Sequence, residues 1–385
     1  MKPIVVMYVM GKWSYSNQSL FGALQSQMPQ YELKMIDLVQ ALRKPRFAML
    51  MCLLDLPSLI TKALIARKFD KHYLLYASFT SKYIHYLAIQ LTKRYRPFFT
   101  IQTTTRFDAS SPRVPHFAII DMTVDAGWKN YQAFYGSSNK ELQDLHQFQK
   151  RVFQNCLAVF AMGNYVKQSL VQDFQIQCNS AITIGAGPNI SVSPAPKVTN
   201  SQTILFVGSH WERKGGPLLV EAFKIVYEKH PDATLQIIGC NPGIDMPGID
   251  VVGKVARHEL HHYFSRARVF VLPTQLEAFG IVFVEALHFG LPIIATNIGA
   301  IPDMVEHGNN GLLIDIGDLD ALVQALDQVL SNDSLALKMR KAALEKAQKF
   351  DWDRAASIID QHVHESITLA YQNKRYEPYC MKNPA

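Results

Sequence analysis

The segment "VFVLPTQLEAFGIVFVEALHFGLPIIATN", residues 269–297, contains two short apolar runs separated by a polar loop and a longer apolar stretch. The runs at 269–272 and 291–296 have the length and composition of buried strands. Residues 281–289 start with a β-branched run that also fits a strand, but Glu-Ala-Leu and the stop signal Gly-Leu-Pro favour a helix. A strand, a helix and a second buried strand in succession predict a parallel sheet covered by helices.

The same alternation of apolar strands and helices extends over the rest of the second half. Strands are expected at 203–208, 233–239, 249–255, 268–274, 291–297 and 310–315, and helices at 217–230, 257–267 and 318–332. The first half follows a similar pattern, with strands expected at 3–11, 31–38, 71–78, 97–104, 115–121, 157–163 and 181–187. The sequence therefore predicts an α/β protein of two Rossmann-like, doubly wound domains that face each other across a cleft.

The domain boundary is expected in "PNISVSPAPKVTNSQ", residues 188–202, because this stretch is polar and rich in Pro and Ser. We therefore predict an N-terminal domain at residues 1–195 and a C-terminal domain at residues 196–364. The assignment of residues 365–385 is open, since a C-terminal helix there can return to the first domain.

Composition is that of a globular protein, with 48% hydrophobic and 18% charged residues. The longest apolar run, at 47–60, is interrupted by Asp55 and Pro57, so it does not predict a membrane-spanning helix. The start of the chain reads as a strand and lacks the small-residue cleavage site of a signal peptide. Five scattered cysteines without a CxxC pair favour a reduced, cytoplasmic protein.

Charge divides the chain unequally. Residues 1–200 carry 22 Lys+Arg and 10 Asp+Glu, whereas residues 201–385 carry 17 and 22, which gives net charges of +12 and −5. This asymmetry indicates that the first half faces an anionic partner. Its basic residues alternate with long apolar ones, which favours an amphipathic helix at an anionic membrane surface over a nucleic-acid groove. A solvated basic helix face packed on a core is an equal alternative. The basic residues in question include Arg43, Lys44, Arg46, Arg67 and Lys68.

Two glutamates, Glu277 and Glu285, lie in unusually apolar surroundings. A buried carboxylate is costly unless hydrogen bonds or charges compensate it. Gly280 opens a helix whose first turn holds no acidic residue, so its free N–H groups and positive dipole end can bind a phosphate. Glu285, one to two turns further on, can then accept hydrogen bonds from the hydroxyls of an attached ribose. Glu277 is placed to face the group beyond the phosphate.

A second anion-binding feature follows the strand at 203–208. In "FVGSHWERKGGPLL", Arg213 and Lys214 follow the carboxyl end of the strand and precede Gly-Gly and a helix. Two adjacent cations in this position are suited to neutralising a diphosphate. The spacing is not that of a P-loop, which argues against phosphate-loop NTPase chemistry.

These segments resemble the nucleotide-sugar-binding domain of family 4 retaining glycosyltransferases, which have the GT-B fold. The resemblance covers residues 203–355 and is carried by "FVGSHWERKGG", "LEAFGIVFVEAL", "GLPIIATNIGAIPDMVEHGNNGLLI" and "FDWDRAA". It implies that Glu277 is a catalytic residue at the donor sugar and that Glu285 binds the ribose. It also implies that the diphosphate is held by Arg213, Lys214 and the backbone around Phe279, Gly280 and Ile281.

The chain departs from the family pattern in two places. Gly208-Ser209 stands where many members have Gly-Arg. Neutralisation of the diphosphate's charge would therefore rest on Arg213 and Lys214 alone. The first half matches the family only in layout. Where many members carry a histidine at the end of a strand, "VPHFAIID" ends at Asp121. We favour Asp121 over His116, at the start of that strand, as the catalytic polar group near the reacting sugar.

Two motifs that suggest a metal site are set aside. "RHELHHYF" clusters His258, His261 and His262 without the HExxH spacing, and the resemblance implies an ordinary surface helix there. Asp351 and Asp353 in "DWD" precede a helical pattern and read as its N-terminal cap. In GT-B enzymes, cationic side chains and a helix end replace the metal. We therefore expect neither a metal nor a cofactor.

The resemblance implies a retaining glycosyltransferase that moves a sugar from a UDP- or GDP-linked donor to an acceptor hydroxyl. The N-terminal domain would bind the acceptor and the C-terminal domain the donor. The acceptor is left open among a glycan, a lipid-linked molecule and a small molecule, with peripheral binding to the inner face of an anionic membrane as a further expectation. No nucleic-acid partner is expected. Two rivals are a GT-B nucleotide-sugar 2-epimerase and a catalytically silent sugar-nucleotide-binding protein.

Overall fold

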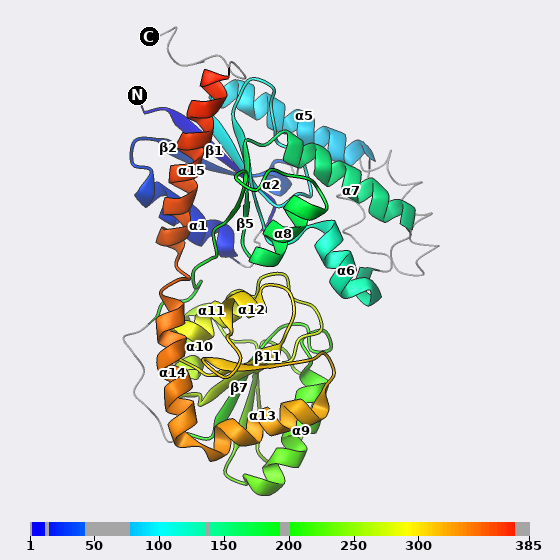
Figure 1. The fold of residues 1–385 in the computed structure, drawn as a ribbon, viewed down its shortest axis with the longest axis vertical. Helices are drawn as coiled ribbons and strands as arrows, with labels where there is room; N and C mark the ends of the chain where they lie inside the picture. The colour runs from blue at the N-terminus through cyan, green and yellow to red at the C-terminus, as the bar shows by residue number, and fades with distance from the viewer. Residues whose placement is uncertain (1, 12–14, 43–77, 136–138, 193–200, 374–385) are drawn as a thin grey trace. The chain divides into compact units, whose positions relative to one another are not determined.

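The computed structural model describes residues 2–11, 15–42, 78–135, 139–192 and 201–373. The chain divides into two compact units, one formed by Met1–Ile184 with Asp353–Ala385 and the other by Gly185–Trp352. Each unit contains one six-stranded parallel sheet covered by helices (Figure 1). The predicted fold class, two Rossmann-like α/β domains, is confirmed.

The sheet of the first unit has the strand order β2-β1-β3-β4-β5-β6. Every residue of its three consecutive strands β3, β4 and β5 is buried, because helices cover both faces, as is usual for a parallel sheet. The strands are β1 (Ile4–Val9), β2 (Glu32–Asp37), β3 (Phe99–Thr103), β4 (His116–Ile120), β5 (Ala158–Ala161) and β6 (Ala181–Thr183).

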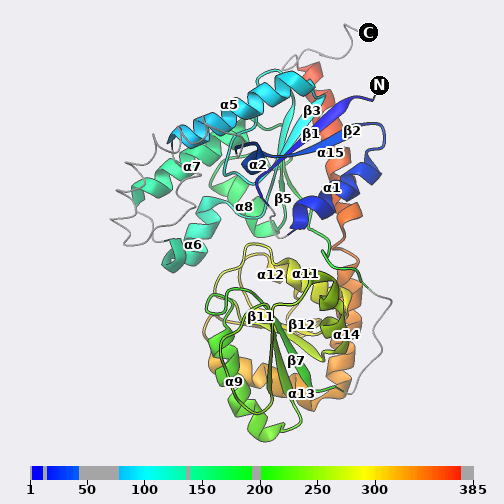
Figure 2. The same ribbon diagram turned by 180° about the vertical axis from the view of Figure 1, so that it is seen from behind.

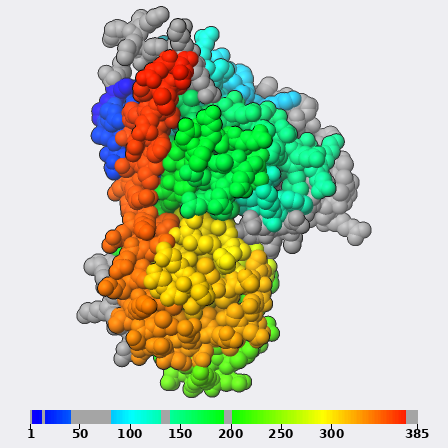
Figure 3. Space-filling view, viewed as in Figure 1, coloured from blue at the N-terminus to red at the C-terminus, as the bar shows by residue number. Residues whose placement is uncertain are grey.

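The helices of the first unit include one that comes from the far end of the chain. From Asp353 on, α15 (Trp352–Gln372) belongs to this unit, and Tyr31 on the N-terminal segment hydrogen-bonds His364 at 2.9 Å. Figure 3 shows this helix, in orange and red, along the surface of the first unit. The others are α1 (Ser16–Gln27), α2 (Leu38–Leu42), α5 (Ser78–Tyr95), α6 (Val124–Tyr135), α7 (Asn139–Gln154) and α8 (Asn164–Gln172).

The second unit, seen from behind in Figure 2, has the strand order β12-β11-β10-β7-β8-β9. Its strands are β7 (Thr203–Val207), β8 (Thr234–Ile238), β9 (Ile249–Gly253), β10 (Val269–Leu272), β11 (Ile293–Thr296) and β12 (Gly311–Ile314). Its helices are α9 (Gly216–Lys229), η2 (Arg257–Glu259), α10 (Leu260–Arg266), α11 (Ile281–His288), α12 (Ile301–Met304), α13 (Leu319–Ser331) and α14 (Asp333–Ala347). The β-branched run at 281–284 is helical, as the stop signal after it predicts.

The strands predicted within the described residues all occur, and the strand predicted at 71–78 lies almost wholly outside them. The strand order reverses direction between β1 and β3 in the first sheet and between β7 and β10 in the second. At such a switch point the loops after the two strands diverge to opposite faces and leave room for a ligand. Each unit therefore offers one preferred binding place at the carboxyl edge of its sheet.

The chain passes between the units at residues 184/185 and 352/353, rather than at the predicted 195/196 and 364/365. The reason is that the two segments at which the chain passes between the units, near residues 185–188 and at Trp352, pack tightly on each other. Trp352 Nε1 donates to the carbonyl oxygen of Pro188 at 3.1 Å. A Cβ on Gly187 would lie 2.4 Å from the backbone nitrogen of Trp352, so only glycine fits there. Residues 185–192 thus belong to the second unit, although their composition is that of a linker.

A buried polar network fixes β3 to β4 in the first sheet. His116 lies at the amino end of β4 and is fully buried. Its Nδ1 pairs with Thr100 Oγ1 at 2.7 Å and its Nε2 with Gln102 Oε1 at 2.9 Å. Because the amide oxygen can only accept, Nε2 carries a proton, and burial favours the neutral form of the ring. Gln102 in turn donates to the carbonyl oxygens of Thr104 and Phe107 and so fixes the loop after β3. His116 therefore has a structural role, far from the carboxyl edge.

We expect the free energy of unfolding to fall as the pH is lowered from about 6.5 to about 4. Burial lowers the pKa of His116 from 6.5 to about 4, with nearby Asp108 opposing and His85 assisting this shift. The unfolded chain therefore binds a proton at this residue before the folded unit does. The stabilisation, roughly 3 kcal/mol, is present in full above pH 6.5 and is lost as the pH falls to 4.

Urea denaturation across this pH range, for the wild type and for His116→Gln, measures the effect. Glutamine preserves an amide donor toward Gln102 but does not titrate, so its profile should be flatter than that of the wild type. Parallel profiles would show that the ring is not held neutral.

Candidate functional site

The loops after β7 and β10 meet at the switch point of the second sheet. The β7–α9 loop carries Arg213 and Lys214, and the β10–α11 loop carries Glu277 and Gly280. These residues are about 63 positions apart in the sequence but are brought together because β7 and β10 are neighbouring strands. The two anion-binding features found separately in the sequence therefore form one site.

Hydrogen bonds join the two loops directly. The carbonyl oxygen of Arg213 accepts from Gln275 N at 2.8 Å and from Thr274 Oγ1 at 3.2 Å. The guanidinium of Arg213 donates to the carbonyl oxygen of Leu276 at 2.5 Å. Thr296 Oγ1 on β11 donates to the carbonyl oxygen of Thr274 and fixes the far side of the same loop. The site is thus supported on three adjacent strands.

Lys214 and Glu277 form a buried ion pair between the loops. The ammonium Nζ hydrogen-bonds Glu277 Oε2, and each side chain is only 11% exposed. Burial is the largest influence on Lys214 and lowers its pKa, against the opposing charge of Glu277. Arg213 lowers it further. Glu277 thus supplies the anion that favours the charged form of Lys214 in this structure.

Two glycines in the left-handed region begin the helices that flank the pair. Gly215 has φ 74° and precedes α9, and Gly280 has φ 88° and precedes α11. Neither helix has an acidic residue in its first turn. The backbone N–H groups of both first turns and the positive ends of both dipoles thus lie at the carboxyl edge of the sheet. The helix start predicted near Gly280 is confirmed.

The residues around Gly280 differ in exposure. Phe279 is buried, and its ring packs against Phe350 with 6.4 Å between centroids. Ile281 is partly exposed at the first position of α11. Phe279 can therefore contribute only its backbone to a ligand, whereas the first turn of α11 is accessible.

Glu285 is buried on α11 and is 7% exposed. Its Oε1 accepts a hydrogen bond from the backbone N–H of Asn189 at 3.2 Å. Burial raises the pKa of Glu285 to about 7, although this hydrogen bond and the charge of Arg257 oppose the shift. The carboxyl group is therefore poised to change its charge near neutral pH.

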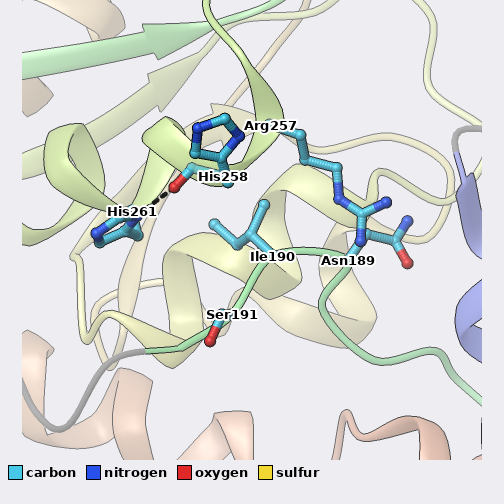
Figure 4. Close-up of a pocket in the computed structure, with 6 residues that line it drawn as sticks. All are labelled: Asn189, Ile190, Ser191, Arg257, His258 and His261. Atoms are coloured by element: carbon cyan, nitrogen blue, oxygen red, sulfur yellow. Dashed lines mark hydrogen bonds between the residues drawn. The ribbon is translucent and has the colours of Figure 1, made fainter.

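A cavity of about 450 Å³ is lined in part by Asn189, the residue whose backbone N–H bonds to this carboxyl group (Figure 4). It is lined by Asn189, Ile190 and Ser191 from the segment after the passage between units, and by Arg257, His258 and His261 from η2 and α10. From the sequence alone, the first group is expected in a linker and the second on an ordinary surface helix. The available signal was that Arg257 and His258 follow the carboxyl end of β9, the edge at which ligands of such sheets bind.

Asp121 lies in the first unit, directly after the carboxyl end of β4. Its carbonyl oxygen accepts a hydrogen bond from the hydroxyl of Tyr165 at 2.6 Å, which fixes the backbone at this point. Its side chain is partly exposed. His116 lies at the opposite end of the same strand, so of the two residues only Asp121 is at the ligand-binding edge of the sheet.

Within the described residues, no group of three or more His, Cys, Asp or Glu side chains is arranged to hold a metal ion. His261 Nδ1 instead pairs with the carbonyl oxygen of His258 at 2.5 Å. Asp351 and Asp353 flank Trp352, the first residue of α15, at the predicted helix start. No helix in the described part of the chain is long and apolar enough to cross a membrane.

We expect Gly215→Ala to destabilise the protein by at least ~2 kcal/mol more than Gly243→Ala. Both glycines have φ near 70°, so both substitutions carry the cost of a left-handed residue. A Cβ at Gly215 would lie 1.9 Å from the carbonyl oxygen of Pro273, whereas one at Gly243 meets nothing within 4 Å. Overpacking against the backbone supplies the difference. Chemical denaturation measures it, and equal losses would show that the two loops can move apart freely.

Comparisons with known proteins agree with this architecture. The family profile for glycosyl transferases group 1 matches residues 191–346. Phosphatidyl-myo-inositol mannosyltransferase of Mycobacterium leprae is 30% identical over 239 residues, which cover 57% of this chain and 64% of that protein. The chain spans about a third to two thirds of the length of the curated relatives it matches.

Two solved structures are similar over nearly the whole chain. Sucrose-phosphate synthase from Thermosynechococcus elongatus has a TM-score of 0.70 at 16% identity and covers 95% of this chain and 100% of its own. HepE from Anabaena, solved with UDP-glucose, has a TM-score of 0.63 at 15% identity and covers 95% and 99%. At these identities the likeness establishes the fold, which is GT-B. The profile match adds that residues 191–346 are similar to the glycosyl transferases group 1 family.

Proposed function

We propose that the protein is a retaining glycosyltransferase that transfers a sugar from a nucleoside diphosphate sugar to an acceptor hydroxyl. The observation that carries this proposal is the convergence of Lys214, Glu277 and the first turn of α11 at one switch point. A cation, a carboxylate and free backbone N–H groups at one place suit a diphosphate with a sugar attached.

In this proposal the diphosphate binds the first turn of α11, at Gly280 and Ile281, and the ammonium of Lys214. These groups stabilise the negative charge that develops on the leaving diphosphate as the bond to the sugar breaks. Arg213 contributes through its hydrogen bond to Leu276, which holds the two loops together, and through its positive charge. The departing phosphate accepts the proton of the acceptor hydroxyl, so attack on the same face retains the configuration of the sugar.

The remaining parts of the donor are assigned by position. Glu285, less than two turns into α11, accepts hydrogen bonds from the ribose hydroxyls. The cavity lined by Arg257 and Asn189, next to Glu285, receives the base. Its volume, about 450 Å³, is in the range of small-molecule sites. Glu277 lies on the other side of the phosphate and contacts the sugar. UDP-glucose is bound by the Anabaena structural neighbour, and UDP and GDP derivatives are the donors to test first.

Asp121 is proposed as the polar group of the first unit that acts on the reacting sugar or the acceptor. It follows a buried central strand, so its backbone is held firmly at the carboxyl edge. Asp121→Asn should therefore lower transfer while nucleotide binding, a property of the second unit, stays intact. A loss of nucleotide affinity instead would exclude this role.

Transfer of a labelled sugar from UDP- and GDP-sugars to a panel of acceptors tests the activity itself. Isomerisation of the donor without an acceptor would favour a nucleotide-sugar 2-epimerase. Binding of the donor with neither transfer nor isomerisation would favour a catalytically silent protein.

We expect the advantage of the wild type over Glu285→Gln in nucleoside diphosphate affinity to increase with pH. Below pH 7 the carboxyl group, whose pKa burial raises to about 7, is mostly protonated and resembles the amide. Above pH 7 it is a carboxylate, which accepts stronger hydrogen bonds from ribose. The dissociation constant of Glu285→Gln divided by that of the wild type should rise from about 1 at pH 6 to roughly 5–30 at pH 8. This corresponds to about 1–2 kcal/mol of binding free energy.

Calorimetric titration of UDP and GDP at both pH values measures this ratio. The ratio also cancels the titration of the nucleotide's own phosphates, which both proteins experience equally. A ratio independent of pH would remove Glu285 from the ribose site.

We propose further that the acceptor lies at an anionic membrane surface. The first 200 residues carry a net charge of +12, far more than the second half. On α5, Lys82, Tyr86 and Lys93 share one helix face. Tyr86 follows Lys82 by four residues, about one turn, and Lys93 follows Lys82 by eleven residues, about three turns. All three are exposed, and Tyr86 is 54% exposed. A face of this kind suits the interface of a bilayer. Arg43, Lys44, Arg46, Arg67 and Lys68 lie outside the described residues.

We expect the protein to sediment with phosphatidylglycerol vesicles at low salt and to be released at high salt. Replacement of Lys82 and Lys93 by Glu should weaken binding at least ~10-fold, since each basic residue near the surface contributes about 1 kcal/mol. Replacement of Lys224 and Lys341 by Glu is the control, because these exposed lysines lie in the acidic second half. Absence of sedimentation, or equal loss in the control, would contradict membrane binding.

A further inference from the structure

We propose that Glu277 is an internal counter-ion that occupies Lys214 until the donor's diphosphate replaces it, and that its return to Lys214 helps to expel the nucleoside diphosphate product. The inference rests on the proposed function, since it concerns the same site. It assigns Glu277 a role in the cycle of binding and release, beyond its contact with the sugar.

The first support is that the pair already exists without a donor. Lys214 Nζ and Glu277 Oε2 are hydrogen-bonded, and both side chains are 11% exposed. An ammonium group in such surroundings needs an anion, because breaking a buried pair leaves an uncompensated charge. Exchange of one anion for another avoids that state. A diphosphate is the replacement that the site can accept, since it brings negative charge to the same ammonium.

The second support is the rigidity of the frame that holds the pair. Arg213 is fixed to the 274–276 segment by three hydrogen bonds, and Gly215 packs so closely on Pro273 that not even a Cβ would fit between them. Lys214 lies between these two residues, so its backbone cannot shift far when a ligand arrives. The exchange must therefore be made by the side chains, with the carboxylate of Glu277 turning away from the ammonium group.

In this proposal the carboxylate of Glu277 limits the affinity of the site for the nucleoside diphosphate product. While the donor is bound, Glu277 faces the sugar hydroxyls, which hydrogen-bond a carboxylate. After transfer the sugar is gone, and the carboxylate lies beside the diphosphate product and competes with it for Lys214. Repulsion between the two anions then favours release. Removing the charge of Glu277 should slow product release and strengthen product binding.

The experiment measures binding of UDP, GDP and inorganic diphosphate to the wild type, Glu277→Gln and Glu212→Gln. Glu212 is exposed on the same loop, two residues before Lys214, so its neutralisation makes the same change in net charge near the site. We expect Glu277→Gln to bind the probes about 5–20-fold more tightly and to release them correspondingly more slowly. Glu212→Gln should stay within about twofold of the wild type.

A second comparison isolates the exchange from general electrostatics. In a Lys214→Met background, Glu277→Gln should give a clearly smaller gain in affinity, because only the repulsion between carboxylate and diphosphate is removed and no ammonium is left to be freed. A merely structural role for Glu277 would weaken binding in both backgrounds, and thermal unfolding identifies any variant that fails to fold.

The outcomes separate the two proposals. If the wild type binds the probes and Glu277→Gln binds them no more tightly than Glu212→Gln does, the counter-ion role is wrong and the donor site stands. If none of the three probes binds the wild type, the donor site itself is wrong, and the exchange with it.

Discussion

The position of α11 is the constraint on which the candidate site depends. Its first turn provides backbone N–H groups at the switch point, and two side chains further along the helix hydrogen-bond the segments through which the chain passes between units. Glu285 accepts from the backbone N–H of Asn189, and His288 Nε2 donates to the carbonyl oxygen of Phe350 at 2.7 Å. A ligand bound at one end of α11 is therefore connected, over eight residues, to both passing segments.

Buried charge is used differently at the two glutamates. Glu277 is compensated by a full cation, whereas the carboxyl group of Glu285 is met by a backbone N–H and the more distant charge of Arg257. Burial raises the pKa of the second group, Glu285, to about 7. Two carboxylates eight residues apart thus acquire different chemical behaviour from their surroundings alone. Such separation is what a site needs when one acid faces a charged group and the other faces neutral hydroxyls.

Much of this could be predicted from the sequence because its signals are local. Strand length, apolar alternation and the stop signal at Gly290 predict the β10–α11–β11 unit, and an acid-free first turn after Gly280 marks an anion site without knowledge of the rest of the fold. The cavity beside Glu285 was missed, because its walls come from residues 189–191 and 257–261, which are separated in sequence and unremarkable in composition. The passage between units was expected about ten residues late, since the packing of Gly187 against Trp352 has no local signature.

The sequence by itself determined the fold class and predicted which side chains suit a diphosphate, because periodicity, glycine positions and residue chemistry are properties of short segments. Only the tertiary structure decided which of these side chains meet. The pairing of Lys214 with Glu277 follows from β7 and β10 being neighbours, an order set by how the whole sheet packs. The neutrality of His116 likewise follows from its burial between Thr100 and Gln102, on the adjacent strand. Contacts between distant segments, and the burial that sets the charge of each group, arise only when the complete core is assembled.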